Sequence, residues 1–132
     1  MAEQAVPPRV LVVDDDDDVR TALRRMFESA GYEVLEAANG RVAMQVCAEH
    51  RPELLLVDIF MPEQEGIETI QAVRRQFPDS KIVAVSGKAG RVYLRMAKLL
   101  GAQATLEKPL RLETVLETAR AVLGDIGNSP LS

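Results

Sequence analysis

Residues 10–20 read VLVVDDDDDVR, so that four apolar residues run directly into five aspartates. The apolar run Val10–Val13 is rich in β-branched residues, which predicts a short strand covered by other elements on both faces. An aspartate run in this position can simply cap a following helix and complement its dipole, at the cost of mutual repulsion. Capping is a sufficient explanation of the aspartates only if no other strand of the chain also ends in a carboxylate.

Strand and helix patterns alternate five times along the chain. Apolar runs predict strands at Val10–Val13, Tyr32–Glu36, Leu54–Val57, Lys81–Val85 and Ala104–Leu106. After each strand, apolar residues recur at helical spacing, in the segments 19–30, 42–47, 67–73, 92–100 and 112–123. Gly31 is expected to end the first helix, Asn39 to cap the second and Pro62 to open the third. This alternation predicts an α/β fold, a five-stranded parallel sheet with helices on both faces.

The strand order of such a sheet decides which side chains meet. For five strands the flavodoxin-like order 2-1-3-4-5 is expected, and its ligand site lies outside the carboxyl ends of strands 1 and 3. In that order Asp14 and Asp15 meet Asp58, which follows the third strand. Three carboxylates this close cannot all stay ionised unless a cation joins them, and Mg²⁺ is the expected cation. Asp17 and Asp18 are left at the expected position of a helix N-cap.

Two more strand ends carry groups that bind anions. Ser86 closes the fourth strand with a hydroxyl group, and Lys108 follows the fifth strand with an ammonium group. Either residue alone in a loop is usually structural. Together with the aspartates, however, they place a metal site, a carboxylate nucleophile, a hydroxyl donor and a cation on one edge of the sheet. This combination predicts the transfer of a phosphoryl group onto Asp58.

In order and placement, these residues resemble the receiver domains of two-component response regulators. The resemblance is carried by VLVVDD, which ends in Asp14 and Asp15, by LLLVDIFMPEQEG with Asp58, by IVAVSG with Ser86 and by LEKP with Lys108. It covers residues 9–123 as one receiver domain. Residues 1–8 are expected to form a flexible N-terminal lead-in and residues 124–132 a flexible C-terminal tail.

The resemblance implies that Asp58 accepts phosphate from a histidine kinase, a phosphotransfer protein or a small phosphodonor. The chain would then be a switch with Mg²⁺-dependent self-phosphorylation and slow self-dephosphorylation, rather than an enzyme. Mg²⁺ would be bound by Asp15, Asp58 and the main-chain carbonyl of Phe60, with Asp14 assisting. The peptide bond between Lys108 and the proline that follows it is expected to be cis.

The resemblance also implies how the signal leaves the site. Ser86 would move toward the phosphoryl oxygens and Lys108 would pair with them. The switch would act on a protein-interaction face made of the fourth helix, the fifth strand and the fifth helix. That face would bind a downstream protein target, or a second copy of the domain on phosphorylation.

Three positions near the site depart from the family's usual pattern. Phe60 stands where members often carry a polar side chain, and Lys88 occupies another variable position. Thr105 stands at the switch position where many members have a Tyr or Phe that turns inward on activation. Because Thr105 has no ring, we expect the change to appear mainly in residues 87–100, with Tyr93 as its reporter.

Other classes of protein fit less well. A phosphohydrolase of the haloacid dehalogenase type would need a second acid at Phe60, and a dinucleotide-binding enzyme would need a glycine-rich turn after the first strand. The remaining alternative is a degenerate receiver that acts as an unphosphorylated docking or scaffold protein. Such a protein usually lacks a site residue, and this chain lacks none of Asp14, Asp15, Asp58, Ser86 and Lys108.

Composition limits the classes of binding partner and the cellular compartment that are expected for this chain. The 132 residues carry a net charge of -4, which argues against nucleic acid or an anionic membrane as the direct partner. The start, MAEQAVPPR, lacks the pattern of a signal peptide. With Cys47 as the single cysteine no internal disulfide can form, so a cytoplasmic location is expected.

Overall fold

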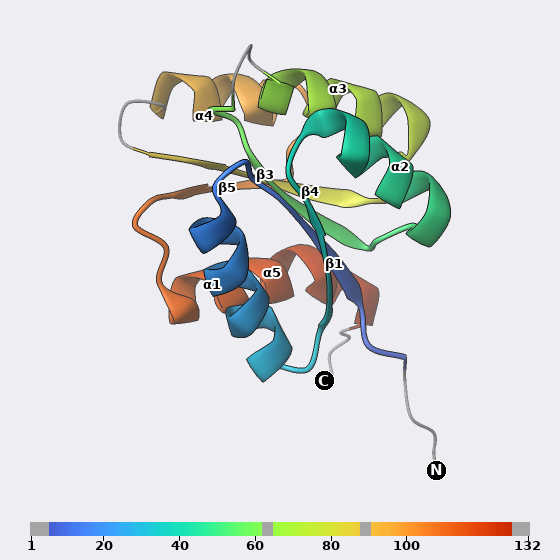
Figure 1. The fold of residues 1–132 in the computed structure, drawn as a ribbon, viewed down its shortest axis with the longest axis vertical. Helices are drawn as coiled ribbons and strands as arrows, with labels where there is room; N and C mark the ends of the chain where they lie inside the picture. Colours follow the sequence, from blue (N-terminus) through green and yellow to red (C-terminus); the bar gives the residue numbers. More distant parts are fainter. Residues whose placement is uncertain (1–5, 62–64, 88–90, 128–132) are drawn as a thin grey trace.

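The computed structural model describes residues 6–61, 65–87 and 91–127, in which strands and helices alternate. The elements are β1 (Arg9–Val13), α1 (Asp17–Ser29), β2 (Glu33–Ala37), α2 (Gly40–His50), β3 (Leu54–Asp58), α3 (Glu65–Gln76), β4 (Lys81–Ser86), α4 (Arg91–Leu99), β5 (Ala104–Glu107) and α5 (Leu112–Gly127). All strand pairs are parallel, in the order β2-β1-β3-β4-β5 (Figure 1). The predicted α/β fold and its flavodoxin-like strand order are confirmed.

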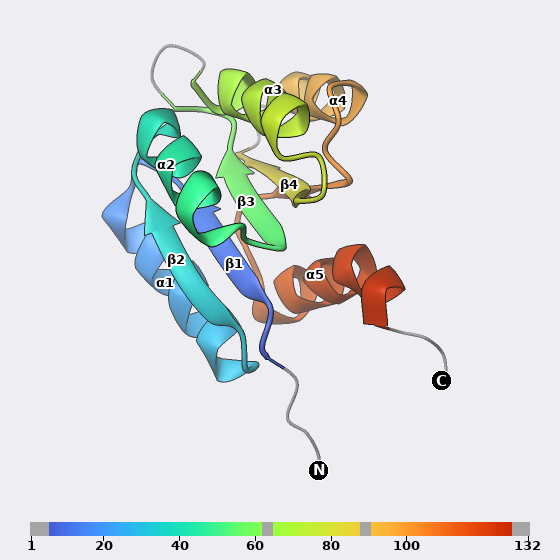
Figure 2. The same ribbon diagram turned by 90° about the vertical axis from the view of Figure 1, so that its right-hand side faces the viewer.

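Helices cover both faces of the sheet. The helices α2, α3 and α4 lie on one face, and α1 and α5 lie on the other (Figures 1 and 2). Successive residues of the buried strands therefore enter different cores. Leu55 of β3 packs with α2, α3 and α4, whereas its neighbours Leu54 and Leu56 pack with α1 and α5. If β3 slipped by one residue against its neighbours, each of these side chains would point into the wrong core. The two cores together therefore fix the strand register that aligns the carboxyl ends of the strands.

The start of α1 differs from the prediction. Asp16 is the N-cap, because its carboxylate accepts hydrogen bonds from the main-chain N–H groups of Asp18 and Val19. The expectation that Asp17 and Asp18 are the cap was therefore wrong. Both lie in the first turn of the helix, where their charges complement the helix dipole.

Other element boundaries also differ from the prediction. The strand β2 runs from Glu33 to Ala37, one residue later than predicted. The helix α5 continues to Gly127, into the segment where we expected a tail from residue 124. Gly31 follows the end of α1 at a φ of 92°, as expected for a residue that ends a helix. Pro62, expected to open α3, lies outside the described residues.

The single cysteine is part of the core. Cys47 is fully buried between α2 and the sheet, and burial raises the pKa of its thiol to about 11. A thiol with this pKa stays protonated and packs as a small apolar group. Within the described ranges, no helix combines the length and the apolar character needed to cross a membrane.

Candidate functional site

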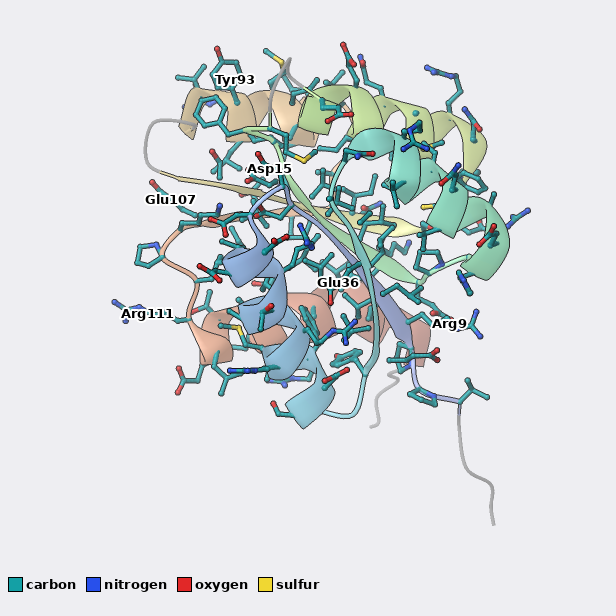
Figure 3. All side chains as sticks on the ribbon, viewed as in Figure 1. Arg9, Asp15, Glu36, Tyr93, Glu107 and Arg111 are labelled. Carbon is teal, nitrogen blue, oxygen red and sulfur yellow. The ribbon has the colours of Figure 1, made fainter. Side chains whose placement is uncertain are left out.

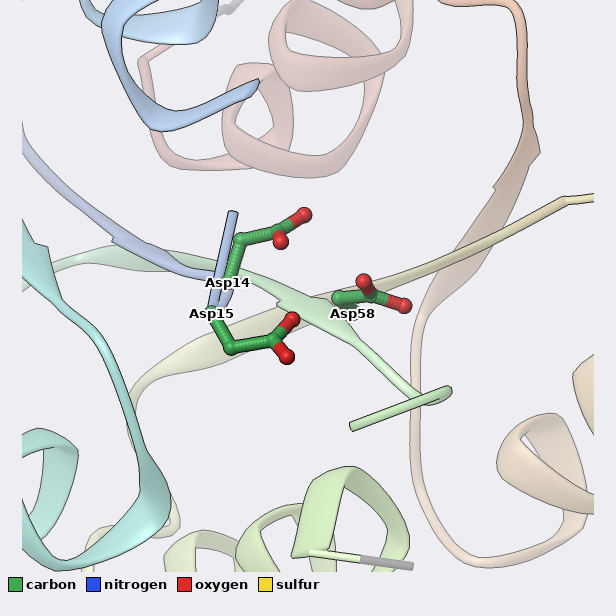
Figure 4. Close-up of side chains that lie close together, drawn as sticks. All are labelled: Asp14, Asp15 and Asp58. Atoms are coloured by element: carbon green, nitrogen blue, oxygen red, sulfur yellow. The ribbon is translucent and has the colours of Figure 1, made fainter. Parts of the chain in front are cut away.

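The carboxyl ends of β1 and β3 bring three aspartates together. Val13 pairs with Val57 across the sheet, so the residues that follow them, Asp14 and Asp58, are neighbours. One carboxylate oxygen each from Asp14, Asp15 and Asp58 lies within 4.8 Å of the other two (Figure 4). Asp14 and Asp58 are buried and Asp15 is exposed, so the cluster opens to solvent on the side of Asp15.

Lys108 supplies a positive charge to this cluster. Its Nζ lies 3.4 Å from Asp58 Oδ2 and 3.5 Å from Asp14 Oδ2. Burial alone would lower the pKa of the ammonium group, but the charges of Asp58 and Asp14 outweigh burial and raise it. The Lys108-Pro109 peptide bond is cis, as expected. The main-chain N–H of Lys108 donates a 2.7 Å hydrogen bond to the carbonyl of Ser86, which joins β5 to the end of β4.

One ammonium group does not satisfy three carboxylates. The pKa of Asp14 is raised to about 6, chiefly by burial and also by the charge of Asp58, although a hydrogen bond from the Asp16 N–H and the charge of Lys108 both act to lower it. A second cation would relieve this unfavourable burial of charge. The donors present are carboxylate oxygens, which are the ligands of hard divalent cations such as Mg²⁺. The cluster is thus of the right chemistry to hold such an ion.

The main chain after β3 orients the Asp58 carboxylate. The N–H of Phe60 donates a 2.9 Å hydrogen bond to Asp58 Oδ1, while Oδ2 faces Lys108. Gly66 in α3 lies against this segment, because a Cβ at Gly66 would overlap the main chain of Asp58 and Ile59. Sequence reasoning gave Gly66 no role. A glycine inside a helix, where it costs stability, is the signal that could have indicated such a close approach.

Ser86 lies beside Asp58 at the end of β4. Asp58 pairs with Val85, and Ser86 is the next residue. Its side chain is fully buried, and its Oγ has no hydrogen-bond partner among the residues that the structure describes. A buried hydroxyl group without a partner costs free energy, so Ser86 can gain by bonding to a group bound at Asp58. Thr105 lies on β5, where it pairs with Ala84 of β4, and it is partly exposed. Lys88 lies outside the described residues.

Arg20 holds the acidic loop in place, which sequence reasoning missed. Its guanidinium group donates hydrogen bonds to the main-chain carbonyl of Asp14 at 2.6 Å and to Glu36 Oε1 at 3.0 Å, and it also contacts Asp17. Glu36 lies on β2 (Figure 3) and forms an ion pair with Arg24 as well, at 2.7 Å. Arg20 thus ties α1 and β2 to the residue that begins the cluster. An arginine one turn into a helix that follows several aspartates is too common a pattern to have indicated this.

Variants of Arg20 and Arg24 form a matched pair that tests whether the hydrogen bond from Arg20 to the Asp14 carbonyl stabilises the fold. Arg20→Gln is expected to lower the free energy of unfolding by about 1–2 kcal/mol, because it leaves the main-chain carbonyl of the buried residue Asp14 without its charged donor and removes one of the two arginine partners of Glu36. Arg24→Gln loses only the half-exposed contact with Glu36 and should cost less than about 0.5 kcal/mol. Urea unfolding of both variants measures the difference. Equal losses would show that the bond to Asp14 adds nothing to stability.

Sequence comparison relates most of the chain to known proteins. Residues 10–120 match the family model of the response regulator receiver domain. Response regulator MprA of Mycolicibacterium vanbaalenii is 39% identical over 119 residues, which make up 89% of this chain and 51% of that protein. This chain therefore spans about half the length of that relative. The chemotaxis protein CheY of Thermotoga maritima is 36% identical over 115 residues, which are 86% of this chain and 96% of CheY.

Solved structures agree on the fold. The structure of the chemotaxis protein CheY4 of Vibrio cholerae superposes with a TM-score of 0.83 at 32% sequence identity, and the match covers 89% of this chain and all of that one. The similarity thus extends over most of the chain.

Proposed function

Because the chain belongs to the response regulator receiver domain family, we propose that it is a phosphorylation switch in a phosphorelay, with Asp58 as the phosphoacceptor. The donor is a histidine kinase, a phosphotransfer protein or a small phosphodonor such as acetyl phosphate. The chain acts as a switch rather than as an enzyme with a separate substrate, and it phosphorylates itself from small donors and slowly loses the phosphoryl group. A cytoplasmic location fits the buried, protonated thiol of Cys47.

The arrangement around Asp58 is the observation that carries this proposal. One carboxylate oxygen is held by the Phe60 N–H, and the other lies beside the Lys108 ammonium group. In the transfer, a carboxylate oxygen of Asp58 forms a bond to phosphorus while the bond from phosphorus to the donor breaks, and the donor leaves with that electron pair. Lys108 and the buried Ser86 hydroxyl group would then bind phosphoryl oxygens at the end of β4.

The same residues would hold the metal ion. We assign Mg²⁺ to Asp15, Asp58 and the main-chain carbonyl of Phe60, with Asp14 assisting. A bound Mg²⁺ would neutralise charge between these carboxylates and an incoming phosphoryl group. The raised pKa of Asp14 supports the assignment, because it reflects burial of this carboxylate and the nearby charge of Asp58, and a bound cation would counter both effects.

The proposed output surface is the face of α4, β5 and α5, which would bind a downstream protein or a second copy of the domain. The helix α4 supports this role, because Val92, Met96 and Leu99 are all exposed at helical spacing along one side. Ser86 and Thr105 are the switch positions at the edge of this face. The alternative of a degenerate docking receiver gains no support from the site, since each expected site residue is present.

Mg²⁺ binding tests the metal part of this function. At a concentration one hundred times its Kd, Mg²⁺ should stabilise the folded protein by about 2.7 kcal/mol. Asp15→Asn should lose most of that gain, whereas Asp18→Asn, which removes another exposed aspartate of the same run, should keep it. Thermal melts with Mg²⁺ and with EDTA measure the effect, and labelling by acetyl phosphate should stop in EDTA. A wild type that is insensitive to Mg²⁺ in both experiments would refute the metal site.

A further inference from the structure

An aromatic contact joins the phosphorylation site to α4. The rings of Phe60 and Tyr93 lie with their centroids 5.3 Å apart and their planes tilted by 54°. This spacing lies within the range of favourable aromatic pairs. Phe60 follows β3 by two residues, whereas Tyr93 lies in the first turn of α4 and is labelled there in Figure 3. The contact therefore bridges two elements that are far apart in the sequence.

The Phe60 main chain extends this contact to Asp58. The ring and the N–H belong to the same residue, and the N–H donates a 2.9 Å hydrogen bond to Asp58 Oδ1. If a shift of Tyr93 moves the Phe60 main chain together with its ring, the geometry of that hydrogen bond changes. Since Lys108 holds the other oxygen of Asp58, the orientation of the carboxylate depends on both contacts.

The helix α4 is weakly held, so a single ring contact can matter to it. Among its side chains that the structure describes, Leu94 and Ala97 are buried, while Val92, Met96 and Leu99 are exposed. An element with few buried contacts opens at a low free energy. Tyr93 packs partly against the core between the sheet and α2, α3 and α4. Within the described ranges, its contact with Phe60 is the only pair of aromatic rings that involves α4.

We infer that Tyr93 is a positioning residue for the Asp58 carboxylate, acting through Phe60, and that this ring pair couples the state of Asp58 to the position of α4. The inference rests on the proposed function, in which Asp58 is the phosphoacceptor. When Asp58 becomes an acyl phosphate, the Phe60 N–H loses its ionised carboxylate acceptor, so the bond weakens and the Phe60 ring is released. The coupling is reciprocal, so a partner that moves α4 changes the orientation of Asp58.

Amide exchange of residues 91–99 tests the coupling, first without any phosphoryl group or mimic. Tyr93→Leu and Phe60→Leu should each speed exchange about two- to tenfold, the range expected for losing an aromatic pair. The double variant should be no faster than either single one, because both remove the same contact. Tyr93→Phe keeps the ring and should restore the wild-type rate. Arg95→Lys, a change at an exposed position of the same helix, should leave the rate unchanged.

Amide exchange with beryllofluoride, which mimics a phosphoryl group, is the second part of the test. Beryllofluoride should speed the exchange of residues 91–99 at least twofold in the wild type. In Phe60→Leu and Tyr93→Leu, the increase in exchange rate should be less than half of the wild-type increase. Binding of the mimic is monitored separately by fluorine NMR. Additive effects in the double variant, or a full response in both Leu variants, would overturn the coupling. If the mimic fails to bind the wild type, the proposed function fails, while exchange in the unmodified proteins still decides whether the ring pair holds α4.

Discussion

Lys108→Met is expected to lower the free energy of unfolding by about 1–3 kcal/mol at pH 7 without divalent cations. The substitution keeps the length of the side chain but removes the ammonium group that lies 3.4 Å from Asp58 and 3.5 Å from Asp14. Two buried carboxylates would then face each other without a cation. The pKa of Asp14, already raised to about 6 by burial, should rise further.

The sign of the pH dependence follows from this shift. A carboxyl group whose folded pKa exceeds its unfolded value stabilises the protein fully below the unfolded pKa, and that stability is lost as pH rises through the folded pKa. For Asp14 the window runs from about 4 to about 6, and it should extend upward in Lys108→Met. The variant should therefore regain stability on mild acidification or on adding Mg²⁺.

Urea unfolding at pH 5.5 and 7, with and without Mg²⁺, measures both effects. Lys98→Ala removes an exposed lysine from α4 and serves as the control, with an expected change within about 0.5 kcal/mol. If Lys108→Met unfolds like the wild type at pH 7 in EDTA, the ammonium group does not hold the carboxylate cluster together.

The strand-end residues of the site were predictable from the sequence, and the contacts that support them were not. Parallel strands bring their carboxyl ends to one edge whatever their exact length, so Asp14, Asp15 and Asp58 meet even though β2 begins one residue late. Lys108 could be placed in the same way, because it follows the last strand. The rule needs only the strand order, which the apolar runs and their number indicate.

The supporting contacts depend on details that one-dimensional patterns do not contain. Five identical aspartates cannot show which of them caps α1, because the cap is set by where the main chain turns into the helix, and this turned out to be Asp16. The bond from Arg20 to the Asp14 carbonyl depends on how α1 packs beside β1 and β2. The contact of Phe60 with Tyr93 likewise depends on the tilt of α4, which no periodicity records.

The second large effect concerns Asp58, the proposed phosphoacceptor. Asp14 and Asp15 contribute to the same cluster, and Asp14 also has a main-chain donor on one oxygen and the Lys108 ammonium group near the other. Asp58 differs because it lies between β1 and β4, where it has both of these contacts and the buried Ser86 hydroxyl group beside it. A nucleophile oriented in this way gains most from the site, so phosphorylation should be confined to Asp58. Asp58→Asn keeps the shape of the side chain and removes the ionised nucleophile, so labelling should fall to zero.

Intact-mass measurement after incubation with acetyl phosphate and Mg²⁺ tests this claim most directly. The wild type should gain one phosphoryl group, and Asp18→Asn, which changes an exposed aspartate in the first turn of α1, should gain it as well. Asp58→Asn should gain none. A phosphoryl group that persists in Asp58→Asn, or a wild type that never gains one, would contradict the account.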